Sequence, residues 1–163
     1  MAARALPRLP PGGIRNERGE CLCALRAASP PPGARPLFAV VIAHRDGQVL
    51  LVHNRKRRVW ELPGGWIDPG ETPAQCALRE LAEESACHAG ALRLMAWIGL
   101  QGADTPDAST TWGAVYAAEV GAPTRSEPDP EISAVMACRA DALPTPTSAI
   151  DAWLLRQFSA TRG

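Results

Sequence analysis

Residues 64–90 read GGWIDPGETPAQCALRELAEESACHAG, and the organisation of the chain can be worked out from this stretch. A glycine-rich segment leads into TPAQ at residues 72–75, which is a capping box with proline at the first helical position. No helix-breaking residue follows as far as Ser85, and the alanines and leucines in between favour a helix. The stretch therefore predicts a loop followed by a helix that begins at residue 73.

The predicted helix has two distinct faces, because successive residues are rotated by roughly 100° about its axis. The residues that we expect to pack on a core are Ala74, Ala77, Leu78, Leu81 and Ser85. Glu80, Glu83 and Glu84 share another face, where like charges destabilise an isolated helix. A hard divalent cation such as Mg²⁺ or Mn²⁺ prefers oxygen ligands and would turn that repulsion into binding. Acidic runs on helices are more often solvated surface, so the three carboxylates by themselves leave both interpretations open.

The spacing of the charged residues around this helix resembles the signature of the Nudix family. Five residues separate Gly65 from Glu71, and seven more separate Glu71 from the sequence RELAEE at residues 79–84. The signature has glycine, glutamate, arginine-glutamate and a glutamate pair at the same intervals. All charged positions of the Nudix signature are therefore present in this chain.

The chain departs from the signature where the helix should end. The family has a glycine and an aliphatic residue at the positions of Ala86 and Cys87. Glycine there would let the helix end in a left-handed cap. Because alanine replaces it, we expect the helix to continue and to end nearer Gly90.

The resemblance implies the α/β/α sandwich of the Nudix family, with a mixed β-sheet between helices, whereas the sequence pattern alone predicts only the α/β class. It also implies a hydrolase that acts on phosphoric anhydride bonds. The substrate that we expect is a nucleoside triphosphate, ordinary or oxidised, cut to monophosphate and pyrophosphate as in MutT-like members. The alternatives are ADP-ribose, another nucleotide sugar or a dinucleoside polyphosphate as substrate, and a Nudix-like ligand sensor without activity. The complete set of carboxylates argues against the sensor.

Several site residues follow from the resemblance. Glu80, Glu83 and Glu84 match the family's ligands for Mg²⁺ or Mn²⁺, and the backbone carbonyl of Gly65, or of its neighbour Gly64, would add another. Glu84 is the first candidate for bridging ions at the substrate phosphates.

Arg79 and Glu71 match a pair that the family uses to orient a ligand carboxylate and to fix the loop, and we include both among the catalytic candidates. Without the resemblance, Glu71 would be only a partner of the helix N-terminus and Arg79 a solvated residue. Many members of the family take a general base or a further metal ligand from a loop outside the signature. Glu127 and Glu131, in a polar loop before the last expected strand, are the candidates for that role.

Residues that bind the substrate are less well defined. The basic run at residues 55–58 is either a solvated hairpin end or a surface that attracts phosphate, and in the second case Arg55 and Arg57 bind substrate. A tryptophan near a sheet is more often part of the core, but an indole can also stack on a nucleobase. Trp112 is our candidate for such stacking.

Composition excludes several classes of protein. The 163 residues, of 17.3 kDa, carry 17 basic and 17 acidic residues, so no net charge attracts nucleic acid or an acidic membrane. No apolar run has the length of a membrane span. Five cysteines form no disulfide framework and indicate reduced thiols in the cytoplasm. The expected partner is a small nucleotide, and the sequence leaves open whether the chain forms a homodimer.

The first 35 residues differ in composition from the rest. Arginine, proline, glycine and alanine dominate them, which predicts an N-terminal extension with one strand near residues 20–25. A targeting peptide and an overlong start assignment are alternative explanations of this segment. The Nudix hydrolase domain is expected over residues 36–163. Its expected strands cover residues 37–43, 48–53, 92–100, 110–120 and 132–139, and a second helix covers residues 149–158.

Overall fold

The computed structural model describes residues 5–102, 110–125, 127 and 129–159. Its two helices are α1 (Pro73–Ser85) and α2 (Ala149–Ser159). Its strands are β1 (Ile14–Arg15), β2 (Cys21–Arg26), β3 (Phe38–Arg45), β4 (Gln48–Asn54), β5 (Val59–Glu61), β6 (Gly64–Trp66), β7 (Arg93–Gln101), β8 (Thr111–Glu119) and β9 (Ile132–Cys138). The five strands and the two helices expected of the domain are confirmed, with small shifts at their ends.

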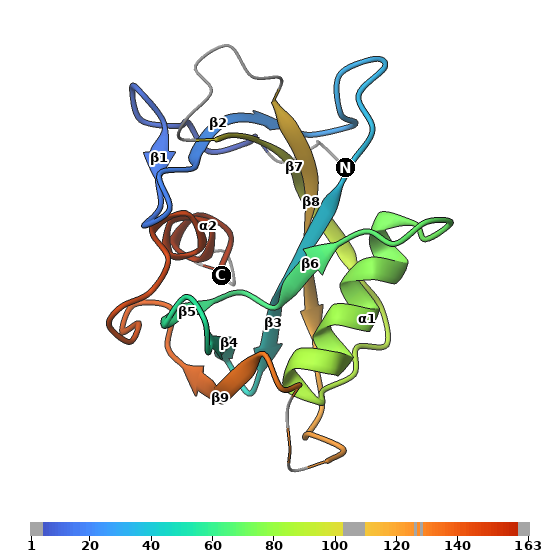
Figure 1. Cartoon of the computed structure of the whole chain (residues 1–163), viewed down its shortest axis with the longest axis vertical. Helices are drawn as coiled ribbons and strands as arrows, with labels where there is room; N and C mark the ends of the chain where they lie inside the picture. Colours follow the sequence, from blue (N-terminus) through green and yellow to red (C-terminus); the bar gives the residue numbers. More distant parts are fainter. Residues whose placement is uncertain (1–4, 103–109, 126, 128, 160–163) are drawn as a thin grey trace.

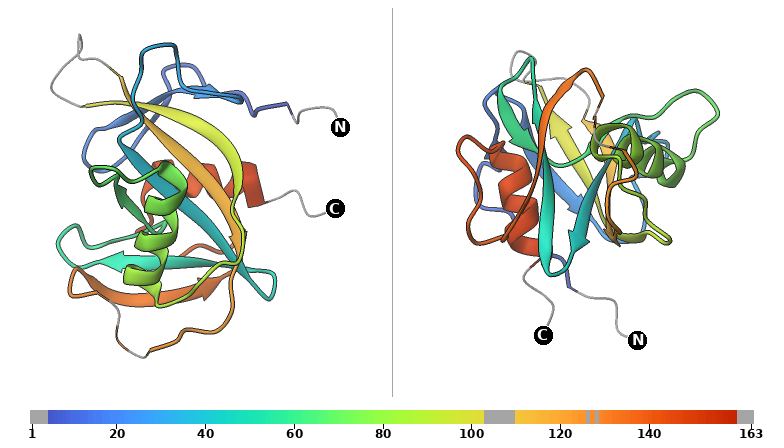
Figure 2. Two further views of the ribbon diagram at one scale, coloured as in Figure 1. Left: turned by 90° about the vertical axis from the view of Figure 1, so that its right-hand side faces the viewer. Right: turned by 90° about the horizontal axis from the view of Figure 1, so that it is seen from below.

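The strands of the described residues form one mixed sheet with the order β1-β2-β7-β8-β3-β4-β5 (Figure 1). Strand β6 also pairs with β3, and β9 pairs with β4. The central strands β3 and β8 run parallel, whereas β3 pairs with β4 and β6 in antiparallel fashion. The helices α1 and α2 lie on opposite sides of this sheet in both further views (Figure 2). The predicted α/β/α sandwich is therefore confirmed.

The central strand β3 supplies both cores, because alternate residues of a strand point to opposite faces. Ala39, Val41 and Ala43 are fully buried on the side of α1, where they share a cluster with Cys76 and Leu81. On the other side, Ile42 of β3 lies in a cluster with Leu154 and Leu155 of α2. Both helices thus pack on β3, whose neighbour β6 begins the stretch at residues 64–90.

Helix α1 ends at Ser85, so the prediction that it continues towards Gly90 is wrong. Ala86 takes the left-handed conformation (φ 60°, ψ 14°) that glycine would have taken, and its N–H donates to the Ala82 carbonyl. Such a conformation costs an L-residue roughly 1–2 kcal/mol. The carbonyl of Ala86 accepts two bonds from Thr124, from the backbone N–H at 2.9 Å and from the hydroxyl at 3.1 Å, which hold it in place.

The buried face of α1 also differs in part from the prediction. Ala77, Leu81 and Ser85 are buried as expected, but Leu78 is 40% exposed. Cys76, which we did not assign to this face, is fully buried, and its thiol lies 3.5 Å from the Gly65 carbonyl. The face of α1 that packs against the sheet therefore includes Cys76, in the first turn of the helix, whose thiol contacts the backbone at Gly65.

The first 35 residues contribute to the same sheet. The strand expected near residues 20–25 is found as β2, which pairs with β7 and buries Leu22 completely. The domain boundary at residue 36 stays a prediction. All five cysteines are free thiols. In the part of the chain that the structure describes, no helix is long and apolar enough to span a membrane.

Candidate active site

The start of α1 is fixed by the predicted capping box. The Thr72 hydroxyl accepts from the Gln75 N–H at 3.1 Å, and the Gln75 side chain accepts from the Thr72 N–H at 2.9 Å. These bonds satisfy two backbone donors that a helix start would otherwise leave free. The charged side chains that follow are thereby held in a defined register.

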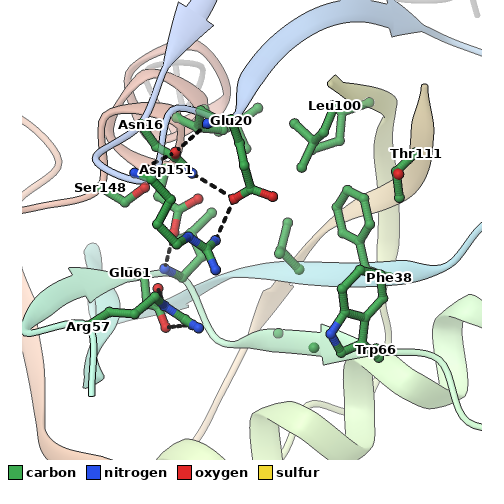
Figure 3. Close-up of a pocket in the computed structure, with 18 of the residues that line it drawn as sticks. Asn16, Glu20, Phe38, Arg57, Glu61, Trp66, Leu100, Thr111, Ser148 and Asp151 are labelled. Carbon is green, nitrogen blue, oxygen red and sulfur yellow. Dashed lines mark hydrogen bonds and ion pairs between the residues drawn. The ribbon is translucent and has the colours of Figure 1, made fainter. Parts of the chain in front are cut away.

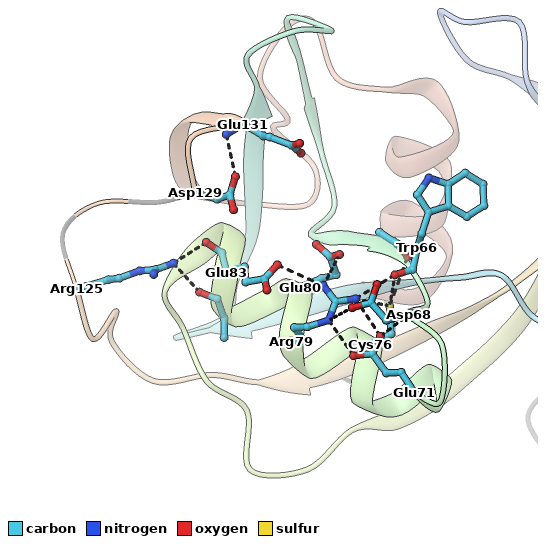
Figure 4. Close-up of polar contacts among 12 residues, drawn as sticks. Trp66, Asp68, Glu71, Cys76, Arg79, Glu80, Glu83, Arg125, Asp129 and Glu131 are labelled. Atoms are coloured by element: carbon cyan, nitrogen blue, oxygen red, sulfur yellow. Dashed lines mark hydrogen bonds and ion pairs between the residues drawn. The ribbon is translucent and has the colours of Figure 1, made fainter.

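Arg79 joins α1 to the segment at residues 64–71, called the glycine loop below, which runs from β6 towards the start of the helix (Figure 4). Its Nε and Nη2 donate to the two oxygens of Glu71 at 2.8 and 2.9 Å, and Nη2 also donates to the Trp66 carbonyl at 3.0 Å. Its Nη1 donates to Glu80 at 2.9 Å and to Glu83 at 3.3 Å. The hydrogen-bonded guanidinium lowers the pKa of Glu71 to about 2. The structure thus brings the predicted pair of Arg79 and Glu71 together.

Glu80 and Glu84 form a partly buried acidic pair under the loop. Burial, with the nearby charges of Glu80 and Glu61, raises the pKa of Glu84 to about 9. Burial also raises the pKa of Glu80, although Arg79 opposes the shift. Among the described residues, Oε2 of Glu84 is buried without a hydrogen-bond partner. At neutral pH a carboxyl with such a raised pKa keeps its proton, and a bound cation would favour its ionised form.

These residues fit a hard divalent ion, although they do not enclose one. Within the described ranges, no three acidic, histidine or cysteine side chains converge on one point, and Glu80 and Glu83 are turned towards Arg79. Mg²⁺ usually takes one or two protein carboxylates and completes its shell with water and substrate phosphates. The buried pair of Glu80 and Glu84 meets that requirement. Glu83 is half-exposed and lies at the edge of the pair.

Gly65 lies directly against the acidic pair. A Cβ atom at this position would overlap the Glu80 carboxylate, so any other residue there would displace that carboxylate from its present place. The carbonyl of Gly65, which we predicted as a metal ligand, lies 3.5 Å from the Cys76 thiol.

The loop between β8 and β9 docks on the C-terminal end of α1 (Figure 4). Arg125 donates through Nη2 to the backbone carbonyls of Ala82 at 3.1 Å and Glu83 at 2.6 Å. The Asp129 N–H donates to the same Glu83 carbonyl at 3.2 Å. Sequence reasoning missed this role of Arg125. The available signal was that α1, all of which is described, has no basic residue in its last turn to meet the negative helix end.

The predicted acidic candidates of that loop, Glu127 and Glu131, make no hydrogen bond or ion pair with Glu80 or Glu84 among the described residues. Glu127 and Glu131 are both exposed, and the Glu131 N–H donates to the Asp129 side chain at 2.9 Å. Of the three acidic residues, Asp129 is the one whose backbone is bonded to the helix that carries the glutamates. No motif marks any of them, so the sequence could not order them.

A pocket of about 270 Å³ opens beside Gly64 and Gly65 (Figure 3). Figure 3 shows Phe38 and Trp66 on one side of it and Asn16, Glu20 and Asp151 on the other. Its charged lining residues are Arg18, Glu20, Arg57, Glu61 and Asp151. The pocket is therefore continuous with the glycine loop that covers the acidic pair.

Of the predicted substrate-binding residues, only Arg57 is among the described residues that line the pocket. Arg57 lines the pocket and is paired with Glu61 at 2.5 Å, whereas the Arg55 side chain donates to the Pro130 carbonyl at 3.1 Å. Trp112 is only 8% exposed and is not among the described residues that line the pocket. Trp66 lines it and is 67% exposed, and its ring stands edge-on to Phe38 with centroids 6.4 Å apart. The accessible indole of the pocket is thus that of Trp66.

Asp151 connects α2 to the short segment between β5 and β6. Its carboxylate accepts from the Leu62 N–H at 2.9 Å, two residues before Gly64. Burial, together with the charge of Glu61, raises the pKa of Asp151 to about 7. Sequence reasoning missed this residue, because nothing near position 151 shows that it reaches a loop 89 residues away.

The comparisons with known proteins agree with this geometry. The sequence matches the NUDIX domain family over residues 33–158, and the chain therefore belongs to the Nudix family. Among solved structures, a Bacillus subtilis pyrophosphohydrolase superposes with a TM-score of 0.71 at 20% identity, over 90% of this chain and 91% of that one. A MutT NUDIX hydrolase from Burkholderia pseudomallei gives 0.63 at 25% identity, over 76% and 98%.

Curated proteins with a similar sequence match this chain over a shorter stretch. An RNA pyrophosphohydrolase of Aeromonas hydrophila is 48% identical over 52 residues, which are 32% of this chain and 30% of the relative. One from Yersinia enterocolitica is 41% identical over 64 residues, 39% and 37% of the two chains. The chain thus matches about a third of the length of these curated relatives.

Proposed function

We propose that this protein is a divalent-metal-dependent pyrophosphohydrolase that cuts a nucleoside triphosphate, ordinary or oxidised, to monophosphate and pyrophosphate. The observation that supports this most strongly is the buried pair of Glu80 and Glu84 beside the glycine loop. One oxygen of Glu84 lacks a partner among the described residues, and a bound cation would favour the ionised form of this buried carboxyl. The membership of the Nudix family and the resemblance to a MutT hydrolase structure point in the same direction.

In this proposal, Glu80 and Glu84 hold Mg²⁺ or Mn²⁺, with Glu83 and the Gly65 carbonyl as further ligands. A bound ion would mask phosphate charge and lower the pKa of a coordinated water. Arg79 keeps the Glu80 carboxylate oriented, and Glu71 keeps Arg79 in place. The acidic loop with Glu127, Asp129 and Glu131 is the proposed source of the proton acceptor, because Asp129 is docked on the same helix.

The pocket supports a nucleotide as the substrate. The exposed ring of Trp66 offers a stacking surface within a pocket of about 270 Å³, and the opposite wall is polar. The triphosphate chain would lie at Gly64 and Gly65, where the pocket meets the acidic pair. The base would then occupy the space towards α2.

A second candidate substrate is the 5′-triphosphate end of RNA. The similar proteins from Aeromonas hydrophila and Yersinia enterocolitica are RNA pyrophosphohydrolases. In addition, Arg55, Lys56 and Arg58 are exposed next to the pocket residue Arg57 and could attract further phosphates. If RNA is the substrate, its binding weakens steeply with salt, because each phosphate contact releases counterions.

Phosphate release from a panel of substrates tests the proposal. The panel contains ordinary and 8-oxo triphosphates, ADP-ribose, diadenosine polyphosphates and 5′-triphosphorylated RNA, each with Mg²⁺ and with EDTA. A coupled pyrophosphatase reports pyrophosphate, and a phosphatase reports products that lack it. We expect pyrophosphate from a triphosphate and none with EDTA. Turnover that EDTA leaves unchanged, or none on the whole panel, would contradict the proposal.

We further propose that the enzyme works in the cytoplasm on soluble nucleotides. The five free thiols and the balanced charge support this location. Fractionation of cells that carry a tagged full-length chain would test it, since recovery with membranes would contradict the expectation.

A further inference from the structure

A turn at residues 16–20 forms one wall of the pocket, although it precedes the part of the chain that matches the family. Asn16, Arg18 and Glu20 line the pocket, whereas the family match begins at residue 33. The turn connects β1 to β2, and β2 is fixed in the sheet by its pairing with β7. This chain thus builds part of its pocket from residues that the family domain does not supply.

The turn is held in one conformation by its own side chains. The Asn16 side-chain oxygen accepts from the N–H of Arg18 at 3.0 Å and of Glu20 at 2.9 Å. The Asn16 amide donates to the Glu20 carboxylate at 3.0 Å, and Arg18 pairs with the same carboxylate at 2.7 Å. The Arg18 guanidinium therefore has a defined place at the pocket.

In the described part of the chain, this side of the pocket carries two arginines and three acidic residues, and it therefore has no net positive charge. Arg18 is paired with Glu20, Arg57 is paired with Glu61, and Asp151 adds no positive charge. An anion would gain little here, so the phosphates belong at the other end, beside Gly64 and Gly65. A ligand group that suits these walls is uncharged and offers both hydrogen-bond donors and acceptors.

A nucleobase has these properties. A guanidinium donates to ring nitrogens and carbonyl oxygens, and a carboxylate accepts from ring N–H and amino groups. The exposed indole of Trp66 on the far side provides a face for a planar ring. The walls thus match a base that carries a carbonyl acceptor and an N–H donor, which adenine, without a carbonyl, matches less well.

We propose that the turn at residues 16–20 is a base-recognition element, in which Arg18, oriented by Glu20, contacts the nucleobase of the substrate. The inference rests on the proposed nucleotide substrate, and it adds a specificity-determining residue outside the family domain. Arg18 is not placed in the hydrolytic step.

Binding of nucleoside monophosphates to the full-length chain tests this without turnover. Isothermal titration calorimetry would compare AMP, GMP, CMP, UMP and ribose 5-phosphate on the wild type, Arg18→Ala, Arg18→Lys and Glu20→Gln. Arg26→Ala is the matched control, because Arg26 is an exposed residue of β2 that bonds the Ser29 carbonyl and does not line the pocket. Thermal unfolding would confirm that each variant is folded.

We expect Arg18→Ala to bind the preferred monophosphate about tenfold more weakly, as for one lost charge-assisted hydrogen bond, and to bind ribose 5-phosphate as the wild type does. The control Arg26→Ala should bind all ligands like the wild type. In turnover assays KM rises by a similar factor while kcat stays unchanged. Three results would overturn the proposal. Arg18→Ala could bind the monophosphates as tightly as the wild type, it could lose ribose 5-phosphate binding to the same extent, or the wild type could bind all bases equally. If the wild type distinguishes bases through Arg18 but hydrolyses no anhydride, only the proposed function fails.

Discussion

The two ends of the site are built in opposite ways. At the proposed metal end, one contiguous stretch places Glu80 and Glu84 beside the glycine loop. Arg79 pairs with Glu80, whereas burial raises the pKa of Glu84 to about 9 and its Oε2 has no hydrogen-bond partner among the described residues. At the pocket end, residues from the first 20, the β5 region and α2 meet, and each arginine has a carboxylate partner. A buried carboxyl such as Glu84 ionises more readily when a cation binds to it. A pocket whose arginines are already paired can discriminate between uncharged groups.

The largest effect is expected at the metal end. Glu84→Gln removes the buried charge that would hold the ion and should lower turnover roughly 100-fold or more, because metal stabilisation of a transition state is worth several kcal/mol. The fold should survive, since a neutral amide is easier to bury than a carboxylate. Steady-state pyrophosphate release and circular dichroism would measure both effects. Near-normal activity in Glu84→Gln would rule out the mechanism.

A smaller loss of activity is expected from a change at Arg79, which contacts the proposed metal ligand Glu80. Arg79→Lys keeps the charge but loses the fork that binds Glu71 at two points and Glu80 at the same time. Outer partners of metal ligands typically change activity by about 10- to 100-fold. We expect kcat to fall within that range and Mn²⁺ binding to weaken. A lysine variant as active as the wild type would mean that Arg79 serves only the structure of the loop.

At the pocket end, the expected effect is on stability and depends on pH. The pKa of Asp151 is about 7 in the folded protein and near 3.8 in an unfolded chain. The unfolded chain therefore releases this proton first, and stability falls as the pH rises from about 4 to 7. The difference in pKa corresponds to at most about 4 kcal/mol. Asp151→Asn, which still offers an oxygen to Leu62, should lack this decline.

Urea unfolding of both proteins across this range isolates the effect of Asp151, because all other groups titrate in both. The difference in unfolding free energy between Asp151→Asn and the wild type should grow between pH 4 and pH 7 and then stay constant. A difference that does not change with pH would show that Asp151 has an ordinary pKa in the folded chain.

The helix that carries the proposed metal ligands could be predicted from the sequence, because its geometry is local. Helical periodicity places Glu80, Glu83 and Glu84 on one face, and the capping box fixes the helix start, as the structure confirms. The helix end was predicted wrongly, because the bonds that hold Ala86 in a left-handed conformation come from Thr124, which is distant in the chain.

The pocket end could not be predicted in the same way. Which tryptophan is accessible depends on the packing of the sheet, which buries Trp112 and leaves Trp66 exposed. Asp151 and the turn at residues 16–20 reach the pocket only through tertiary contacts, and the composition of the first 35 residues predicted an extension. Periodicity describes single elements, whereas this pocket is formed by segments that meet only in the folded chain.

Mn²⁺ binding, measured by electron paramagnetic resonance, tests the central claim most directly. The wild type, Glu84→Gln and the control Asp141→Asn would be titrated, since Asp141 is an exposed residue that pairs with Arg139. We expect the wild type and the control to bind Mn²⁺ equally, Mg²⁺ to displace it, and Glu84→Gln to bind at least about tenfold more weakly. Equal binding by all three proteins would contradict the assignment of the buried pair as the metal site.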